Sequence, residues 1–170
     1  MIAYKFLSNG AIGPFSAAHW PPAGEWLEVD GQLKVCANGV HACSRETLAY
    51  WLGEELWTVE LDGEIVDEGT VLVAGRGRLV SRIDRWPAVS LRFAEACAER
   101  TRELSTRAPE NARVTGLATE AGEHAERAEE PRHAVIAAYA AAVAADILDL
   151  GGFDCERAWQ SGTLADLLGA

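Results

Sequence analysis

The sequence predicts an α+β protein with a mostly antiparallel N-terminal sheet at residues 1–86 and an Ala-rich extension at residues 87–170. Five of the six tryptophans and most of the short alternating apolar stretches lie in the first part. The second part holds 21 of the 30 alanines and has charged residues at helical spacing. We therefore expect a C-terminal layer of about four α-helices packed on an N-terminal β-rich domain.

Short strands are expected throughout the first part. The clearest spans 55–61, where Trp57, Val59 and Leu61 share one face. Residues 10–24 contain three prolines and are expected to form an irregular loop. Ser44 can cap a short helix. The expected strands lie at about residues 2–7, 26–30, 33–36, 39–43, 55–61, 70–74 and 78–84.

The second part is expected to be helical throughout. Pro87 fits the first turn of a helix that runs to about Arg107. A weaker helix is expected at about 110–129, and Pro131 begins a third. Asp154 can cap a fourth, in which Trp159 and Leu164 are among the residues expected to face inward.

The charge excludes some partners. With 26 acidic and 15 basic residues, the net charge is -11, which repels the phosphates of long nucleic acids and of acidic membranes. Residue 1 is not followed by the pattern of a signal peptide, and no run of about 18 apolar residues occurs. We expect a cytoplasmic protein of bacterial type whose four cysteines are free thiols.

The segment from Cys36 to Cys43 (CANGVHAC) places two thiols and one imidazole within eight residues. It is open to three interpretations. Cys36, His41 and Cys43 could bind a metal, although their spacing is unusual and a fourth ligand is missing, so no metal is expected. A cysteine could act as a nucleophile beside His41 as base. His41 could instead contact a ligand or hold the structure, with the thiols half-buried beside it.

This segment also carries a resemblance. Together with residues 4–7, 48–52 and 56–64, the Gly-x-His-Ala-Cys motif at 39–43 resembles an uncharacterised domain family of phage-encoded and bacterial proteins. The resemblance covers about residues 2–86. It implies no established activity.

More distantly, the order of elements is similar to ADP-ribosyltransferase-like proteins, notably rifamycin ADP-ribosyltransferases and RNA 2′-phosphotransferases. The resemblance implies NAD as co-substrate and an acidic residue that stabilises an oxocarbenium ion. His41 and either Asp67 or Glu68 would be catalytic, with Glu64 a third candidate for the acid. Lys5 and Phe6-Leu7 depart from the family's His and Gly-Thr. The residues implied to bind the cofactor are Tyr4, Lys5, Ser44, Tyr50 and Arg78.

Aromatic and basic residues elsewhere leave alternatives open. Trp20 and Trp26 flank the proline-rich loop and could stack on a ring or pin the loop to the core. The arginines late in the sheet could hold a phosphate-bearing ligand or pair with nearby acids. They are Arg76, Arg78, Arg82 and Arg85.

Three functional hypotheses follow. The first is an NAD- or nucleotide-binding protein of ADP-ribosyltransferase type, a candidate glycosyltransferase that acts on a small molecule or a macromolecule. The second is a non-catalytic interaction or regulatory module, of immunity or antirepressor type. Its helical surface between Arg100 and Glu130 would meet a basic partner. The third is a small metal-binding protein that uses Cys36, His41 and Cys43. The sequence does not indicate an oligomeric state.

Overall fold

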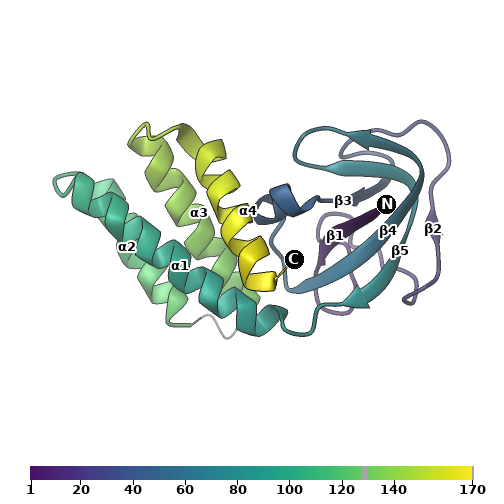
Figure 1. Ribbon diagram of the computed structural model, residues 1–170, viewed down its shortest axis with the longest axis horizontal. Coiled ribbons are helices and arrows are strands. Elements are labelled where there is room, and N and C mark those ends of the chain that lie inside the picture. Colours follow the sequence, from purple (N-terminus) through teal and green to yellow (C-terminus); the bar gives the residue numbers. More distant parts are fainter. Residues whose placement is uncertain (128–129, 170) are drawn as a thin grey trace. The chain divides into compact units, whose positions relative to one another are not determined.

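The expected α+β class is confirmed. Residues 1–127 and 130–169, which the computed structural model describes, form five antiparallel strands, a short 3-10 helix and then four α-helices (Figure 1). The chain divides into two compact units, Met1–Asp84 and Arg85–Ala170. We name them the sheet unit and the helical unit.

A long hairpin forms the middle of the sheet. Strand β1 pairs with β4, β4 pairs with β5, and the two short strands β2 and β3 both pair with the far edge of β5. The 3-10 helix η1 (Arg45–Tyr50) follows β3, and Ser44 and Thr47 form a capping box at its start. The strands are β1 (Ile2–Leu7), β2 (Leu27–Glu28), β3 (Val40–Ala42), β4 (Glu55–Asp67) and β5 (Leu72–Arg82).

Two expectations for the sheet were wrong. Residues 33–36 do not form a strand, because Lys34 and Asn38 exchange backbone hydrogen bonds across a tight turn. The strands expected at 70–74 and 78–84 are one continuous strand, β5. Its glycines do not interrupt it, since Gly77 pairs with both Leu61 and Leu27.

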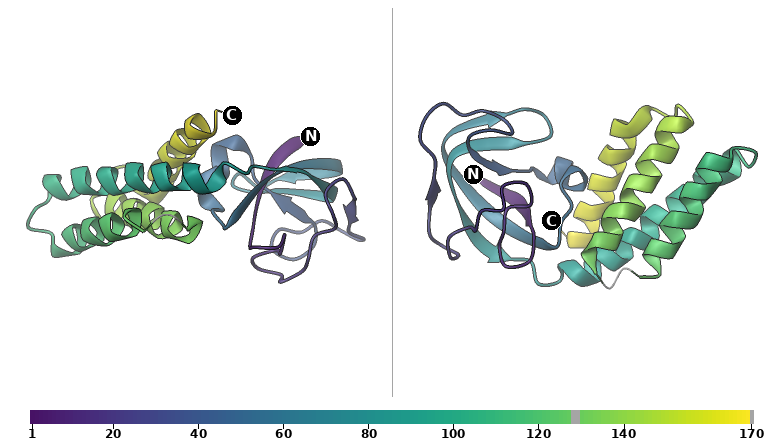
Figure 2. Two further views of the ribbon diagram at one scale, coloured as in Figure 1. Left: turned by 90° about the horizontal axis from the view of Figure 1, so that it is seen from below. Right: turned by 180° about the vertical axis from the view of Figure 1, so that it is seen from behind.

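The sheet closes on itself through one pair of residues. The free edge of β1 meets the end of β3, where the Tyr4 N–H donates to the Cys43 carbonyl at 2.9 Å. The Cys43 N–H donates to the Tyr4 carbonyl at 2.8 Å. The strands therefore curl around a common interior, as the two views in Figure 2 show.

Small residues fill the interior of this closed sheet. Ala3, Ala42 and Ala74 come from three different strands and are buried together. Gly77 faces the same interior, where a Cβ atom would lie 2.7 Å from Val40 Cγ1 and 3.1 Å from Leu61 Cδ2. The remaining members of the buried cluster are Val40, Val59, Leu61 and Leu72.

Helix α3 is the centre of the helical unit. It packs against each of the other three helices, and eight of its alanines are buried, which allows close approach of the helix axes. No helix in the described part of the chain has both the length and the apolar character needed to cross a membrane. The helices are α1 (Trp86–Arg107), α2 (Ala112–Ala125), α3 (Pro131–Ile147) and α4 (Gly152–Leu168). Residues 128 and 129 of the expected second helix lie outside the described residues.

Helix α4 differs from expectation at its start and on its buried face. Its N-cap is Gly151 with φ 85°, and Asp154 lies in the first turn instead of capping it. Trp159 is 39% exposed, with the Arg100 guanidinium 5.5 Å from its ring centroid. The neighbouring Gln160 is buried instead, because its Nε2 donates to the Ala138 carbonyl at 2.8 Å.

We predict that Gly77→Ala destabilises the sheet unit by about 1–3 kcal/mol, because the added methyl group overpacks the closed interior. Gly75→Ala is the matched control, since a Cβ at Gly75 in the same strand meets nothing within 4 Å. Urea unfolding of both variants measures the difference. Equal stabilities would contradict the tight interior.

Candidate functional site

His41 fastens the segment 36–41 to itself through both ring nitrogens. Its Nδ1 lies 2.8 Å from the Gly39 carbonyl, and its Nε2 lies 3.0 Å from the backbone nitrogen of Cys36. A carbonyl can only accept and an N–H can only donate, so the proton sits on Nδ1 and Nε2 accepts. Neither nitrogen is left for a ligand, a metal ion or a reacting proton.

The environment keeps this imidazole neutral. Burial lowers the pKa of His41 below its usual value, the hydrogen bond to the Gly39 carbonyl raises it, and the charge of Lys5 lowers it further. The net pKa is lowered, so the ring is uncharged at neutral pH. A neutral ring with both nitrogens hydrogen-bonded to the backbone fits the third interpretation of the segment, in which His41 holds the structure.

The two cysteines of the segment lie in different surroundings. Cys36 is exposed and has a positive φ of 58°, whereas Cys43 is buried and its Sγ lies 3.4 Å from the Tyr4 carbonyl. Burial raises the pKa of Cys43 to about 12, so its thiol is uncharged and weakly nucleophilic. In the described residues, no group of three or more His, Cys, Asp or Glu is placed to hold a metal ion.

Asn38 and Gly39 complete the fastening. The Asn38 Nδ2 donates to the carbonyls of Asp30 at 2.9 Å and Gln32 at 3.1 Å. Gly39 has φ 140°, and a Cβ there would collide with the side chain of Val73. Residues 30–41 are thus held closely against the outer face of β5.

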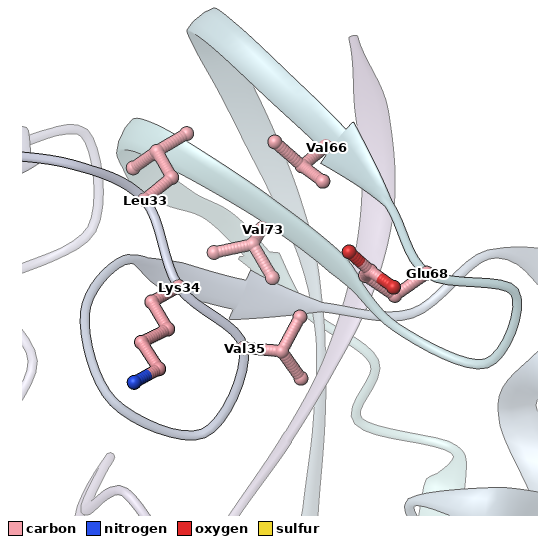
Figure 3. A pocket seen from close by; sticks show the side chains of 6 residues that line it. All are labelled: Leu33, Lys34, Val35, Val66, Glu68 and Val73. Atoms are coloured by element: carbon pink, nitrogen blue, oxygen red, sulfur yellow. The ribbon is translucent and has the colours of Figure 1, made fainter.

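This loop roofs a pocket of about 310 Å³ (Figure 3). Val73 of β5 and Val66 of β4 belong to its apolar lining, and Glu68 and Lys34 lie on opposite sides of the valines. His41 is the cross-strand neighbour of Val73, so the ring that fixes the loop adjoins the pocket. The lining residues are Leu33, Lys34, Val35, Val66, Glu68 and Val73.

The candidate acids differ in what they do. The Asp67 Oδ1 accepts the Gly69 N–H at 2.8 Å and so stabilises the turn between β4 and β5. Glu68 follows in that turn and lines the pocket. Glu64 is exposed at the β4 bulge and does not line it.

Three of the candidate cofactor-binding residues, Ser44, Tyr50 and Arg78, have separate roles in the fold. Ser44 caps η1, and Tyr50 ends it. Arg78 lies on the outer face of the sheet, where its Nε donates to Glu60 at 2.8 Å and its guanidinium lies 4.7 Å from the Trp26 ring centroid. Arg78 is thus already paired within the protein.

Lys5 and Tyr4 lie where β1 meets β3. Tyr4 supplies the backbone pair with Cys43, whereas Lys5 is on the alternate face, the face of the buried Ala3. The charge of Lys5 acts on both His41 and Cys43. Closure of the sheet therefore brings together Tyr4, Lys5, His41 and Cys43. Their proximity follows from strand pairing and does not by itself indicate a cofactor site.

The two loop tryptophans have separate environments. Trp20 packs against the interior cluster, and the Lys5 Nζ lies 5.8 Å from its ring centroid. Trp26 has Arg76 and Arg78 each 4.7 Å from its ring centroid. Arg76 also donates from Nε to Asp62 at 2.9 Å. Arg76 and Arg78 are thus paired with nearby acids, and Arg82 also lies near acids, Glu55 and Asp84. Arg85 lies beyond the sheet, as the N-cap residue of α1.

Glu55, a buried carboxylate at the start of β4, was not predicted from the sequence as a functional residue. It accepts the N–H groups of Gly10 at 3.1 Å and Ala11 at 3.3 Å, and also that of the Trp57 indole at 3.0 Å. Arg82 lies 3.3 Å away. Burial alone would raise the pKa of Glu55, but these bonds and this charge outweigh it, so the pKa is lowered.

No family model, curated protein or solved structure matches the chain. The resemblances to the uncharacterised phage and bacterial domain family and to ADP-ribosyltransferases therefore stay predictions.

We predict that His41→Ala lowers the free energy of unfolding by about 1–3 kcal/mol, because the Cys36 N–H and the Gly39 carbonyl lose their partner. His19→Ala, at an exposed loop position, should change it by less than about 0.5 kcal/mol. Since the folded pKa is lowered, the His41 contribution is complete above pH ~6.5 and shrinks as the pH falls below that value. Urea unfolding at pH 7.5 and 5.5 measures both effects, and a pH-independent difference would contradict the lowered pKa.

Glu55→Gln is expected to lower stability by about 1–3 kcal/mol at neutral pH, because a charged acceptor of three N–H groups is replaced by a neutral one. The depressed pKa of Glu55 means that its contribution is present above pH ~4.5 and is lost as the pH falls toward the folded pKa. Thermal unfolding at pH 7 and pH 3.5 measures this, with the exposed Glu64→Gln as control. A difference of the same size at both pH values would speak against the assignment.

Proposed function

We propose that the sheet unit binds a small ligand with an apolar body in the pocket under residues 33–38. The observation that carries the proposal is the pocket itself, which has an apolar lining and one acid and one base at its rim. Its volume of about 310 Å³ lies at the lower end of the range for small-molecule sites. A ligand the size of one ring with polar substituents suits that space.

The fastened loop supports binding to a preformed site. Asn38 and His41 fix the roof through side-chain bonds to backbone groups, so little ordering of the chain opposes binding. Glu68 can accept hydrogen bonds from hydroxyl or amide groups of a ligand, and Lys34 can pair with an anionic group. Both side chains are exposed at the rim.

Nicotinamide nucleotides are the ligand class that we propose first. The nicotinamide ring is flat and carries an amide, the adjoining ribose carries hydroxyls, and phosphates follow; these groups match valines, Glu68 and Lys34 in turn. Glu68 is the better candidate than Asp67 for the acid of an ADP-ribosyl transfer, because Asp67 already serves its own turn. In this proposal His41 fixes the loop above the pocket and does not hydrogen-bond the ribose.

The non-catalytic interaction module stays a prediction. On the helical surface in question, Arg100 pairs with Glu103 at 3.6 Å and with Glu156 at 3.2 Å, and Arg102 pairs with Glu99. The pairs of Arg100 with Glu103 and of Arg102 with Glu99 are three residues apart and typical of a solvated helix face, whereas Glu156 is buried. None of these pairs by itself favours a basic partner.

Calorimetric titration with NAD, nicotinamide and ADP-ribose tests the proposal. We expect at least one to bind the wild type, and Glu68→Gln to weaken that binding about five- to tenfold through loss of a charged acceptor. Glu64→Gln, an exposed acid in the same hairpin that does not line the pocket, should leave it unchanged. No heat from any of the three at millimolar concentration would overturn the nucleotide proposal. Release of nicotinamide from NAD, measured in parallel, separates transfer from binding.

A further inference from the structure

Lys5 has an unusual position for a lysine. It lies on β1 between Tyr4 and the buried Phe6, is itself mostly buried, and shares its face of the strand with the buried Ala3. Its Nζ lies 5.8 Å from the centroid of the Trp20 ring. Within residues 1–127 and 130–169, no carboxylate lies within ion-pair distance of this amine.

The groups around Lys5 do little to keep it charged. Burial lowers the pKa of Lys5 to about 8, and the nearby Cys43 offsets only part of this effect. The Cys43 thiol is uncharged at neutral pH, and the His41 ring is neutral. At pH 7.5 about a quarter of the Lys5 amine is therefore the free base, against about 0.1% for an ordinary lysine.

We propose that Lys5 is a nucleophilic lysine that forms an imine with a small aldehyde or ketone. The residue is partly exposed, and its amine has no carboxylate partner and lies beside the Trp20 ring, which can flank an aromatic carbonyl compound. The neutral amine adds to the carbonyl carbon to give a carbinolamine, which loses water as the C=N bond forms. Both hydrogens of the amine nitrogen end in the departing water, and no oxidant or reductant is consumed.

This site is independent of the pocket proposed above. Lys5 does not line that pocket, whereas Lys34, the only other lysine of the chain, does and is exposed. The chain thus contains its own comparison, because one lysine side chain is mostly buried beside Trp20 and the other is solvated.

The test is competitive labelling of the intact protein with benzaldehyde at pH 7.5. Sodium cyanoborohydride traps each imine as a stable benzylamine. Fragment-ion mass spectrometry of the peptides that contain Lys5 and Lys34 gives the two rates, because fragmentation separates the label on Lys5 from any label on the Met1 amine of the same peptide. We expect Lys5 to react at least about tenfold faster than Lys34. As the pH is raised from 7 to 9, the Lys5 rate should level off near pH 8, whereas the Lys34 rate should keep rising.

Variants sharpen the result. Lys34→Arg should leave the labelling rate of Lys5 unchanged. Lys5→Met, close in volume to lysine, should abolish the labelling assigned to residue 5 while Lys34 reacts as before. The wild-type comparison stands even where Lys5→Met fails to fold, because both lysines are measured in one molecule. Equal rates for the two lysines, or a Lys5 slower than Lys34, would overturn the proposal. Loss of NAD binding in Glu68→Gln leaves it unaffected, so the two proposals fail separately.

Discussion

The sheet unit depends on the closure between Tyr4 and Cys43. Two backbone hydrogen bonds join the only free edge of β1 to the end of β3, and this turns an open sheet into one with an interior. The small radius then demands small residues inside, which are Ala3, Ala42 and Ala74. Closure also removes edge N–H and C=O groups that would otherwise invite pairing with another chain.

Polar side chains of this unit serve its loops more than its surface. His41, Asn38 and Glu55 each spend their hydrogen-bonding capacity on backbone groups of irregular segments. Because these segments have no ladder of their own, their buried backbone groups need side-chain partners. The result is a fixed loop over a valine-lined pocket. The side chains that fix the loop, such as His41 and Asn38, are different from those that line the pocket.

Local patterns predicted much of the fold, and non-local partners explain what they missed. Alternation located the first part of β4, and Pro87 and Pro131 marked the starts of α1 and α3. The continuity of β5 was missed because Gly77 resembles a strand breaker until its paired neighbours are known. The site was only partly predictable: His41 stood out, but the roles of Glu55 and Glu68 depend on backbone groups and valines distant in the sequence.

Two residues of the segment from Gly39 to Cys43 have a structural role in this chain. Gly39 lies against Val73, and His41 is hydrogen-bonded to two backbone groups. Both residues help to fold the chain back on itself between Cys36 and β3. The side chains that fold this segment back, Asn38 and His41, are therefore not among those that line the pocket.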